Sequence, residues 1–327
     1  MKLLVIGSEE RIRKYLPDTP LVKEVEVVVA ARGSSDEDIL ALAPDADFIM
    51  ADAISPVSAH LMESMPNLKL VHSEGVAYNA IDIDAAKRLG ITVCNNAGVN
   101  AGGVAEQTIL LMLACLRDAV NADTAVREGR QIETKERMMV EGIRELGDCT
   151  VGFIGFGAIA QATAKRLAAW GCPMYYNKRH RLPVDVEAAL GVKLATIDDI
   201  ARTCDIVSIH VPVAEDTRGM VDDEFLAGMK NDAILINTAR GEIVDNDALA
   251  RALESDAILA AGLDVIAPEP VLPDNPLLNL SEKASRKLVL SPHVGGITEG
   301  MFHRAHRNVW DNIERVLNGK TPVNVIV

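Results

Sequence analysis

Three residues in the second half of the chain have side chains that suit proton transfer and anion binding. Arg240 follows one apolar run, Glu269 lies between two prolines beyond a second, and His293 comes after a proline beyond a third. Because parallel strands of an open α/β sheet end at the same edge, we expect these side chains to lie near one another. An imidazole can donate a proton near neutral pH, and a carboxylate can fix its tautomer. A guanidinium binds a carboxylate or a carbonyl oxygen.

This combination suits the reduction of a 2-keto acid, in which the keto oxygen takes a proton and the keto carbon takes a hydride. Each residue taken singly also fits a structural role. Arg240 could form a surface ion pair, Glu269 could be a solvated loop acid, and His293 could cap a helix. Their order along the chain, after a motif typical of a hydride-carrying cofactor, favours catalysis.

That motif is a glycine-rich turn at residues 151–160, Val-Gly-Phe-Ile-Gly-Phe-Gly-Ala-Ile-Ala. An apolar strand breaks here into the pattern Gly-x-Gly-x-x-Ala, which is typical of dinucleotide-binding turns. Gly155 allows the tight turn, Gly157 lets the backbone approach a pyrophosphate, and the final alanine lets the next helix pack on the strand. The helix expected from Ala158 would direct the backbone N–H groups of residues such as Ile159 at the phosphates. An ordinary turn between a strand and a helix is the alternative.

A second strand, predicted at residues 173–176, indicates which dinucleotide to expect. Sites for NAD usually carry Asp or Glu about 20 residues beyond the glycines, where the carboxylate binds the ribose hydroxyls. Here Asn177 is followed by Lys178, Arg179 and Arg181, with no carboxylate among them. Asn tolerates a 2′-phosphate, and the cations can pair with it. A solvated basic loop is the alternative, but in a chain of net charge −14 the cluster favours NADP(H), with NAD(H) as the second choice.

The composition argues against several classes of protein. The chain has 327 residues, 49% of them hydrophobic, which is enough for two domains with large cores. A net charge of −14 argues against nucleic acid or an anionic membrane as a partner. No apolar run reaches the roughly 18 residues of a membrane span, and we expect the N-terminus to form a buried strand rather than a cleaved leader. The five cysteines lack metal-ligand spacing, which predicts reduced thiols, a cytoplasmic location and no metal site.

Short apolar runs alternate with helical patterns along the whole chain, which predicts parallel sheets with helices on both faces. A long helix at residues 103–128 is predicted to lead from a first domain into a second, and a last helix at 300–317 to lead back. A ligand is expected between the domains. The other expected strands are 2–7, 24–30, 47–50, 69–72, 91–93, 205–210, 232–237, 258–263 and 288–290, the other helices are 36–43, 57–65 and 82–89, and residues 321–327 are expected to form an extended tail.

The helix expected at residues 103–128 also bears on assembly. It is rich in Ala, Leu and Val and has more apolar surface than one crossover between domains requires. Pairing with the same helix of a second copy would cover this surface, which predicts a homodimer. Burial within a single chain is the alternative.

Further segments give the chain a resemblance to one family. Residues 75–82 (Gly-Val-Ala-Tyr-Asn-Ala-Ile-Asp), 96–100, 104–106, 210–212 and 217–219 accompany the motifs described above. In this combination the chain resembles the D-isomer-specific 2-hydroxyacid dehydrogenase family over essentially its whole length. Within that family it is most similar to the NADP-dependent glyoxylate and hydroxypyruvate reductases.

The resemblance implies an α/β fold with two doubly wound parallel-sheet domains. A Rossmann dinucleotide-binding domain at residues 102–295 would be inserted into a flavodoxin-like substrate domain at residues 1–101 and 296–327. A small-molecule 2-keto acid would be the substrate, and two copies of the chain would form a homodimer.

The resemblance also implies roles for particular residues. Arg240, Glu269 and His293 would be catalytic, and Arg240 would also bind the substrate. The backbone N–H groups of Val76 and Ala77 would bind the substrate carboxylate, a use of backbone donors that has general precedent. The cofactor contacts implied are Gly155, Gly157, Ala158, Ile159, Asn177, Lys178, Arg179, Val211, Pro212, Thr217, Thr238, Asp264 (at the nicotinamide amide), His293 and Gly295.

Departures from the family pattern indicate which acids could be the substrate. Ser73 stands where phosphoglycerate-type members tend to have Arg, and Glu74 and Asp52 would add negative charge, so a phosphorylated acid is disfavoured. Val76 stands where phosphite-oxidising relatives have Lys, and Ala77 where family members usually have Gly. A small 2-keto acid with an uncharged tail, such as glyoxylate or hydroxypyruvate, fits these positions.

The sequence therefore predicts NADPH-dependent reduction of such an acid to the D-2-hydroxy acid, with His293 as the general acid. One alternative is an NAD-linked dehydrogenase of another D-2-hydroxy acid. The other is a non-catalytic corepressor or scaffold that senses a dinucleotide, which the intact set of Arg240, Glu269 and His293 disfavours.

Overall fold

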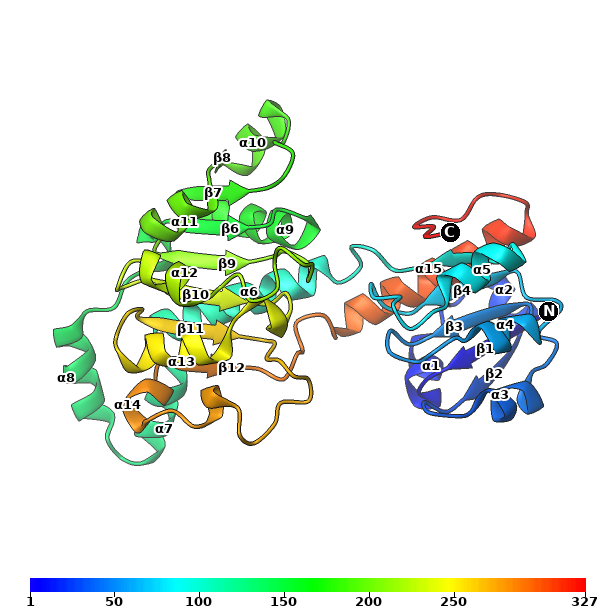
Figure 1. Cartoon of the computed structure of the whole chain (residues 1–327), viewed down its shortest axis with the longest axis horizontal. Coiled ribbons are helices and arrows are strands. Elements are labelled where there is room, and N and C mark those ends of the chain that lie inside the picture. Colours follow the sequence, from blue (N-terminus) through cyan, green and yellow to red (C-terminus); the bar gives the residue numbers. More distant parts are fainter. The chain divides into compact units, whose positions relative to one another are not determined.

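The computed structural model describes all 327 residues, and the chain folds into two compact units (Figure 1). Unit 1 comprises Met1–Asn100 and Ile297–Val327, and unit 2 comprises Ala101–Gly296. Unit 2 is thus inserted, in sequence, between the two segments of unit 1. The last helix belongs to unit 1, so the chain returns to the unit in which it began.

Unit 1 is built on a five-stranded sheet in which every paired strand is parallel, with the order β2-β1-β3-β4-β5. This is the order of flavodoxin-like sheets. The elements of unit 1 are β1 (Lys2–Ile6), α1 (Glu9–Tyr15), α2 (Pro20–Glu24), β2 (Glu26–Ala30), α3 (Asp36–Leu42), β3 (Phe48–Ala51), α4 (Ala59–Glu63), β4 (Leu70–Ser73), α5 (Ile83–Leu89), β5 (Thr92–Cys94) and α15 (Glu299–Leu317).

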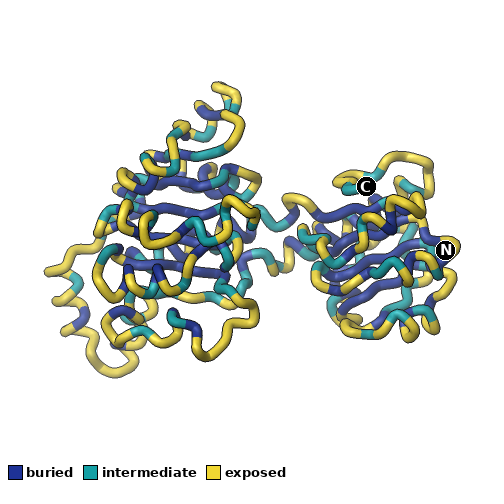
Figure 2. Tube along the Cα trace, in the orientation of Figure 1, coloured by how far each residue is buried: buried dark blue, intermediate teal, exposed yellow.

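Helices cover both faces of this sheet, which explains why its strands are apolar at nearly every position. Side chains alternate between the two faces along a strand. In β1, Leu4 packs with Ile39 of α3 in one cluster, whereas Leu3 packs with Trp310 of α15 in another. Figure 2 shows the strands as the buried centre of the unit, with exposed residues on the surrounding helices and loops.

The C-terminal tail completes unit 1. Val325 forms an isolated antiparallel bridge with Cys94, and the backbone N–H of Ile326 donates to the carbonyl oxygen of Val93 at 2.8 Å. The tail therefore lies along the edge strand β5 and hydrogen bonds to an edge that would otherwise be unpaired.

Unit 2 is built on a seven-stranded parallel sheet with the order β12-β11-β10-β9-β6-β7-β8. The strand order reverses between β6 and β9, as it does at the ligand-binding switch point of a Rossmann sheet. The strands are β6 (Val151–Ile154), β7 (Met174–Asn177), β8 (Val192–Leu194), β9 (Ile206–Ile209), β10 (Ile234–Asn237), β11 (Ala260–Leu263) and β12 (Leu288–Leu290). The predicted fold class, two parallel α/β sheets with helices, is confirmed.

The helices of unit 2 lie on both sides of this sheet (Figure 1). Short 3-10 turns occur in several segments between its helices and strands. The α-helices are α6 (Ala101–Leu116), α7 (Ala119–Arg127), α8 (Gln131–Glu141), α9 (Ala158–Leu167), α10 (Val184–Leu190), α11 (Ile197–Thr203), α12 (Asp223–Gly228), α13 (Asn246–Glu254) and α14 (Glu282–Ser285). The 3-10 turns are Leu146–Asp148, Ala168–Trp170, Gly241–Ile243 and Pro276–Leu278. No helix in the structure is both long enough and apolar enough to span a membrane.

The single helix predicted at residues 103–128 is wrong. The structure has two helices there, α6 and α7, separated at Asp118, which has a left-handed backbone (φ 47°). Asp tolerates this conformation better than most residues, and its carboxylate pairs with Arg137 of α8 at 2.8 Å. That partner lies 19 residues further along the chain, so helical periodicity alone did not reveal the break.

Several short or polar elements were not located from the sequence: helices α1, α2, α8 and α10 to α14, and strand β8. Helices α1 and α2 are each at most seven residues long, and β8 is a three-residue strand at the edge of the sheet. Helix α8 has mixed charges on most faces and little apolar periodicity. Ser8, whose hydroxyl accepts from the backbone N–H of Arg11 at 3.3 Å, was a local signal for the start of α1.

Buried His72 links β4 to α15 and makes a testable contribution to stability. Its Nδ1 lies 2.8 Å from the carbonyl oxygen of Ser73, and its Nε2 lies 3.1 Å from Nδ2 of Asn312. Burial lowers the pKa of His72 from 6.5 to about 4. The neutral ring is thus favoured in the folded state, so stability is full above pH 6.5 and falls as the pH decreases towards 4.

We expect this one group to destabilise unit 1 by about 3 kcal/mol between pH 6.5 and pH 4. Urea unfolding would be measured between pH 4 and pH 7.5. His72→Asn should lower the free energy of unfolding at pH 7.5 but make this free energy depend less on pH. The exposed His60 provides the matched control, because His60→Asn should leave the slope unchanged. Equal slopes for all three proteins would contradict the prediction.

Candidate functional site

The glycine-rich turn between β6 and α9 has the geometry that a dinucleotide requires. Gly155 has φ +84°, and a Cβ added there would lie 2.6 Å from the carbonyl oxygen of His210. At Gly157 no protein atom lies within 4 Å of an added Cβ, so the backbone faces open space. Ala160 is fully buried where α9 packs on the sheet. The first glycine is required by the turn itself, whereas the second leaves room for a ligand.

The N-terminus of α9 fits the phosphates of a dinucleotide. Gly157 is the N-cap of this helix and supplies no side chain to accept hydrogen bonds from the first turn. The backbone N–H groups of Ala158 and Ile159 are therefore available, and the helix dipole favours an anion there. Because the turn follows β6 at the switch point of the sheet, the residues present fit a bound dinucleotide.

The basic segment after β7 separates into free and engaged cations. Asn177 donates its amide to the carbonyl oxygen of Ala195 at 3.0 Å, and no carboxylate hydrogen bonds to it. Lys178 forms no ion pair, and exposed Arg179 makes only a 3.4 Å contact with Asp216.

Arg181, by contrast, is engaged by Glu187. The Glu187 carboxylate receives two hydrogen bonds from the Arg181 guanidinium, at 3.0 and 2.8 Å, and a third from the hydroxyl of Tyr176 at 2.6 Å. Lys178 and Arg179 are thus the cations of this segment with side chains available to a phosphate.

His293 and Glu269, 24 residues apart, are brought into direct contact. Nδ1 of His293 lies 2.8 Å from each carboxylate oxygen of Glu269. The imidazole is 39% exposed and the carboxylate 61% exposed, so the pair is open to a ligand. No group of the chain hydrogen bonds to Nε2, so this nitrogen is available for proton transfer. Neither residue plays the structural role considered above, since Glu269 is paired and His293 caps no helix.

Arg240 lies at the carboxyl end of β10 and is free of any carboxylate. Its Nη1 donates to the carbonyl oxygen of Ala239 at 2.7 Å, and the side chain forms no ion pair. The surface ion pair considered as an alternative is therefore absent. Buried Asn237 holds this loop, because its amide donates to the Arg240 carbonyl oxygen at 2.8 Å and accepts from the Ala239 N–H at 3.0 Å.

The loops that carry Arg240 and Glu269 are packed against each other. A Cβ added at Gly241 would lie 2.3 Å from the backbone nitrogen of Ala267. The carbonyl oxygen of Ala267 in turn accepts hydrogen bonds from Asn246 at 2.6 Å and Asn275 at 3.1 Å. These asparagines were not identified from the sequence, since nothing local distinguishes them from ordinary helix-capping residues.

Asp264, which is expected to lie at a nicotinamide amide, makes several hydrogen bonds within the chain. It is 2% exposed, and its carboxylate accepts from the backbone N–H groups of Val294 at 3.0 Å and Gly295 at 2.9 Å. Its own carbonyl oxygen accepts from the N–H of His293 at 2.8 Å. The contacts that Asp264 makes within the chain therefore hold the loop of His293.

The other expected cofactor positions also have defined places. The hydroxyl of Thr217 donates to the carbonyl oxygen of Pro212 at 2.7 Å, which orders the loop that includes Val211. Thr238 is buried after β10, with its hydroxyl 2.9 Å from that of Thr108 on α6. The structure contains no group of three or more His, Cys, Asp or Glu residues placed to hold a metal ion.

In unit 1, the loop after β4 leaves two backbone donors free. The carbonyl oxygen of Val76 accepts from the amide of Asn95 at 2.7 Å, and that of Ala77 accepts from the hydroxyl of Ser73 at 2.6 Å. The N–H groups of Val76 and Ala77 make no hydrogen bond within the chain. With the carbonyls held, these N–H groups are suited to binding an anion.

The negative charge expected beside this loop is neutralised. Arg11 donates to both oxygens of the Glu74 carboxylate, at 3.0 and 2.6 Å, and His306 lies 2.9 Å from the same group. Arg32 pairs with Asp52 at 2.6 Å. The expectation that Asp52 and Glu74 would repel a phosphorylated acid therefore does not hold, because arginines distant in sequence pair with both.

Comparison with known proteins identifies the family. The sequence pattern of the NAD binding domain of D-isomer specific 2-hydroxyacid dehydrogenases matches residues 109–295. The chain belongs to the D-isomer specific 2-hydroxyacid dehydrogenase family. The predicted family is thus confirmed.

Similar members of the family include two named reductases. The chain is 35% identical to a glyoxylate reductase of Korarchaeum cryptofilum, with 86% of this chain and 83% of the relative aligned. It is 34% identical to a hydroxypyruvate reductase of Thermotoga maritima, with 85% of this chain and 87% of the relative aligned.

The chain is also 34% identical to a D-3-phosphoglycerate dehydrogenase of Mycobacterium bovis, over 94% of this chain. It spans only 56% of the length of that enzyme. Among solved structures, an acyclic imino acid reductase in complex with NADPH and D-Arg superposes over the whole of both chains, with a TM-score of 0.81 and 26% identity.

The contact between Gly241 and Ala267 provides a test of how this dehydrogenase family member holds its site. Gly241→Ala would force its Cβ into a backbone nitrogen 2.3 Å away, so the loops of Arg240 and Glu269 must separate. We expect turnover to fall by roughly tenfold or more and stability by about 1–3 kcal/mol.

The matched control is Gly228→Ala, because nothing lies within 4 Å of an added Cβ there. Turnover of a 2-keto acid and thermal unfolding of the two variants would be compared with those of the parent protein. Unchanged turnover in Gly241→Ala would show that the packing of these loops does not set the site.

Proposed function

We propose that this family member reduces a small 2-keto acid to the D-2-hydroxy acid, with NADPH as the reductant and His293 as the general acid. The observation that carries the proposal is the pair of His293 and Glu269, with Nδ1 at 2.8 Å from the carboxylate and Nε2 unbonded. The unpaired Arg240 at the neighbouring strand end supports it.

The residues of the chain divide the chemistry as follows. A nicotinamide cofactor, when bound, supplies the hydride that the keto carbon takes up. His293 donates the proton at Nε2 to the keto oxygen, so the carbonyl becomes a hydroxyl and the imidazole becomes neutral. Glu269 accepts the Nδ1–H hydrogen bond and fixes the tautomer and orientation of the imidazole ring. Arg240 binds the keto oxygen and the carboxylate of the substrate.

Two observations support NADPH over NADH. No carboxylate hydrogen bonds to Asn177, so nothing at this position would repel a 2′-phosphate. Lys178 and Arg179 are free to pair with one, whereas Arg181 is engaged by Glu187. The similar imino acid reductase was solved with NADPH, which fits the same preference.

The substrate class rests on the relatives and on Ser73. Glyoxylate and hydroxypyruvate reductases align over most of their length, and Ser73 provides no cation for a phosphate. Because Arg11 and Arg32 neutralise the acidic residues beside the loop, charge repulsion no longer argues against 3-phosphohydroxypyruvate. This acid therefore belongs in the substrate panel as the main competitor.

We predict that NADPH oxidation requires both a 2-keto acid and His293. His293→Gln should lower kcat by roughly 100-fold to 10,000-fold, as expected for loss of a general acid, with the Kd for NADPH nearly unchanged. Turnover would be followed by absorbance with glyoxylate, hydroxypyruvate and 3-phosphohydroxypyruvate. Cofactor binding without turnover of any acid would favour the corepressor or scaffold instead.

The cofactor preference has its own test. Asn177→Asp places a carboxylate where the 2′-phosphate would bind, so the ratio of kcat/KM for NADPH over NADH should fall by roughly tenfold or more. Lys178→Gln should shift the ratio in the same direction. Arg181→Gln is the matched control, since that cation is held by Glu187 and its loss should leave the preference unchanged. A ratio insensitive to Asn177 and Lys178 would favour an NAD-linked dehydrogenase.

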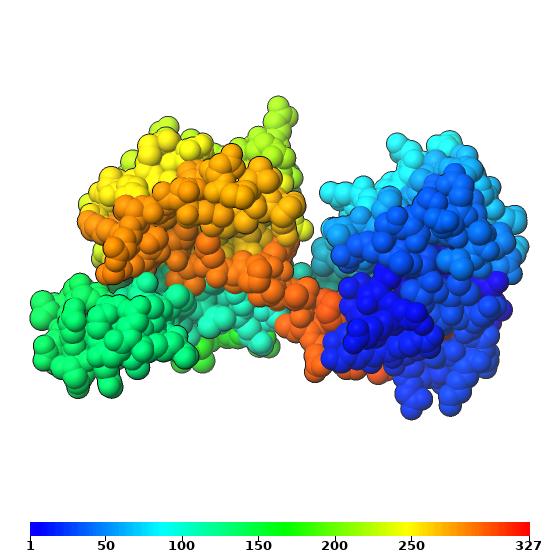
Figure 3. Space-filling model, turned by 90° about the horizontal axis from the view of Figure 1, so that it is seen from below, coloured from blue at the N-terminus to red at the C-terminus, as the bar shows by residue number.

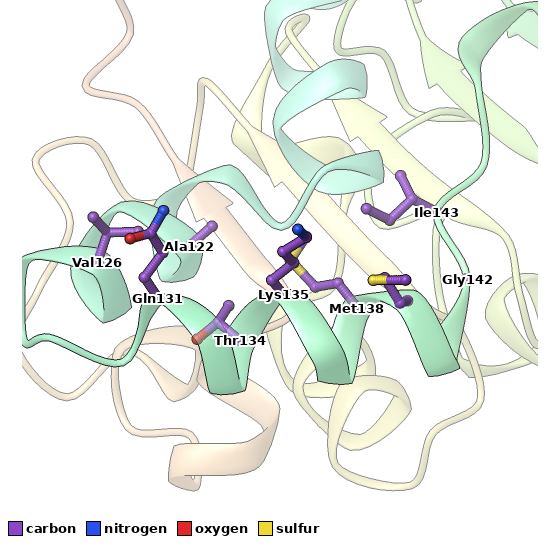
Figure 4. Close-up of a pocket in the computed structure, with 9 residues that line it drawn as sticks. Ala122, Val126, Gln131, Thr134, Lys135, Met138, Gly142 and Ile143 are labelled. Carbon is purple, nitrogen blue, oxygen red and sulfur yellow. The ribbon is translucent and has the colours of Figure 1, made fainter.

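We also propose that the protein is a homodimer that pairs through α7 and α8. A groove of about 500 Å³ lies between these helices, lined largely by apolar side chains including those of Val126, Met138 and Ile143 (Figure 4). Met139, which also lines the groove, is 73% exposed, and the adjacent Val140 is 89% exposed. Figure 3 shows this segment on the surface of unit 2. A groove next to exposed apolar side chains suits a two-fold interface. In such an interface, the exposed side chains of each copy would occupy the groove of the other copy.

Light scattering after size exclusion should give a mass near twice the 35.2 kDa of one chain. Val140→Glu would bury a charge in the interface and should yield monomers at micromolar concentration. Val184→Glu, at the start of α10, is the control, since this valine is also exposed but lies outside the groove. A dimer that survives Val140→Glu would exclude this surface.

The cysteines are consistent with a reducing compartment, and we propose the cytoplasm. All five thiols are free, and four are buried. Burial raises the pKa of Cys94 to about 11 and that of Cys115 to about 12, so these thiols are poor nucleophiles.

A further inference from the structure

A partly buried polar relay connects helix α6 to the loop of His293. Gln107 of α6 donates from Nε2 to the hydroxyl oxygen of Ser291 at 2.8 Å, and the Ser291 hydroxyl donates to Oδ1 of Asp264. Asp264 in turn accepts from the backbone of residues 294 and 295. Neither Gln107 nor Ser291 has a role in the function proposed above.

The hydrogen bonds of this relay can run in only one direction. An amide nitrogen only donates and an ionised carboxylate only accepts, so the Ser291 hydroxyl must accept from Gln107 and donate to Asp264. The relay thereby orients the Asp264 carboxylate towards the loop. A side chain at position 107 that cannot donate would leave the hydroxyl of Ser291 shared between two acceptors.

The loop needs this support because its backbone is strained. His293 has φ +57°, a left-handed conformation that residues other than glycine seldom adopt. The hydrogen bonds to Asp264 from residues 293, 294 and 295 hold that conformation. The direction of the His293 side chain towards Glu269 follows from this backbone, since Cβ is fixed by φ and ψ.

Close packing fixes the relay on its other side. A Cβ added at Gly295 would lie 2.9 Å from Oδ2 of Asp264 and 3.2 Å from Cβ of Gln107. Helix α6 begins at Ala101, the first residue of unit 2. Gly295 directly precedes Gly296, the last residue of unit 2. The relay therefore joins the first helix of unit 2 to its final segment.

We propose that Gln107 and Ser291 are positioning residues that set the proton-donating geometry of His293 through Asp264. This inference rests on the proposed function of the site. On this proposal, the rate of proton transfer from His293 depends on which relay groups donate and which accept hydrogen bonds, and not only on the volume of their side chains.

Gln107→Glu tests polarity at nearly constant volume. At pH 8 the introduced carboxylate cannot donate to Ser291, so we expect kcat to fall about tenfold while the KM for NADPH changes less than twofold. Partial burial and the nearby Asp264 carboxylate should raise the pKa of the introduced carboxyl group above the ordinary Glu value of about 4.3. As the pH is lowered towards 5.5, a growing fraction of this group therefore takes up a proton and can donate again, so the deficit in kcat relative to the parent should shrink. Ser291→Ala should show a similar deficit at every pH, and Ser291→Thr should restore much of the loss.

A control variant and a hydrogen-exchange measurement distinguish a failure of the positioning role from a failure of the proposed function. Glu106→Gln, an exposed neighbour on α6 paired only with Arg166, should match the parent protein throughout. Amide hydrogen exchange without cofactor should be faster over residues 290–296 in Gln107→Glu and Ser291→Ala than in the parent. A parent protein with no turnover would overturn the proposed function, while exchange would still test the relay. Parent-like exchange and kcat, or a deficit in Gln107→Glu independent of pH, would overturn the positioning role.

Discussion

The left-handed backbone of His293 is the constraint on which the candidate site depends. A residue with a β-carbon adopts this conformation only when surrounding groups hold it, and here Asp264 supplies them. The buried carboxylate would be costly on its own, but each of its oxygens accepts a hydrogen bond from the loop. The same contacts that satisfy Asp264 thus direct the imidazole at Glu269.

Asparagine side chains hold the other loops in a similar way. Asn237 holds the loop of Arg240, and Asn246 and Asn275 hold the carbonyl oxygen of Ala267 near Glu269. The strands themselves are apolar and packed on both faces, which gives these polar groups a rigid base. The candidate functional residues therefore lie on loops, and a few hydrogen bonds at the edge of the sheet set the geometry of these loops.

Charge is distributed unevenly between structural and functional positions. Asp52 and Glu74 in unit 1 are buried and paired with arginines. These ion pairs hold the local structure, and the opposite charges largely cancel each other's electrostatic potential. Arg240, Lys178 and Arg179 belong to the minority of cations that lack a strong carboxylate partner. In a chain of net charge −14, unpaired cations at strand ends are suited to anionic ligands.

The sequence alone determined the features that depend on neighbouring residues. Periodicity located nearly all of the strands but only about half of the helices. The glycines marked the turn after β6, and the strand-end positions of Arg240, Glu269 and His293 singled out the candidate site, because each signal lies within a few residues. It did not reveal the break at Asp118, the pairing of Asp52 with Arg32, or the use of Asp264 to hold a loop. Those features depend on partners about 20 or more residues away, and only the packed tertiary structure selects which of the many available donors meets each acceptor.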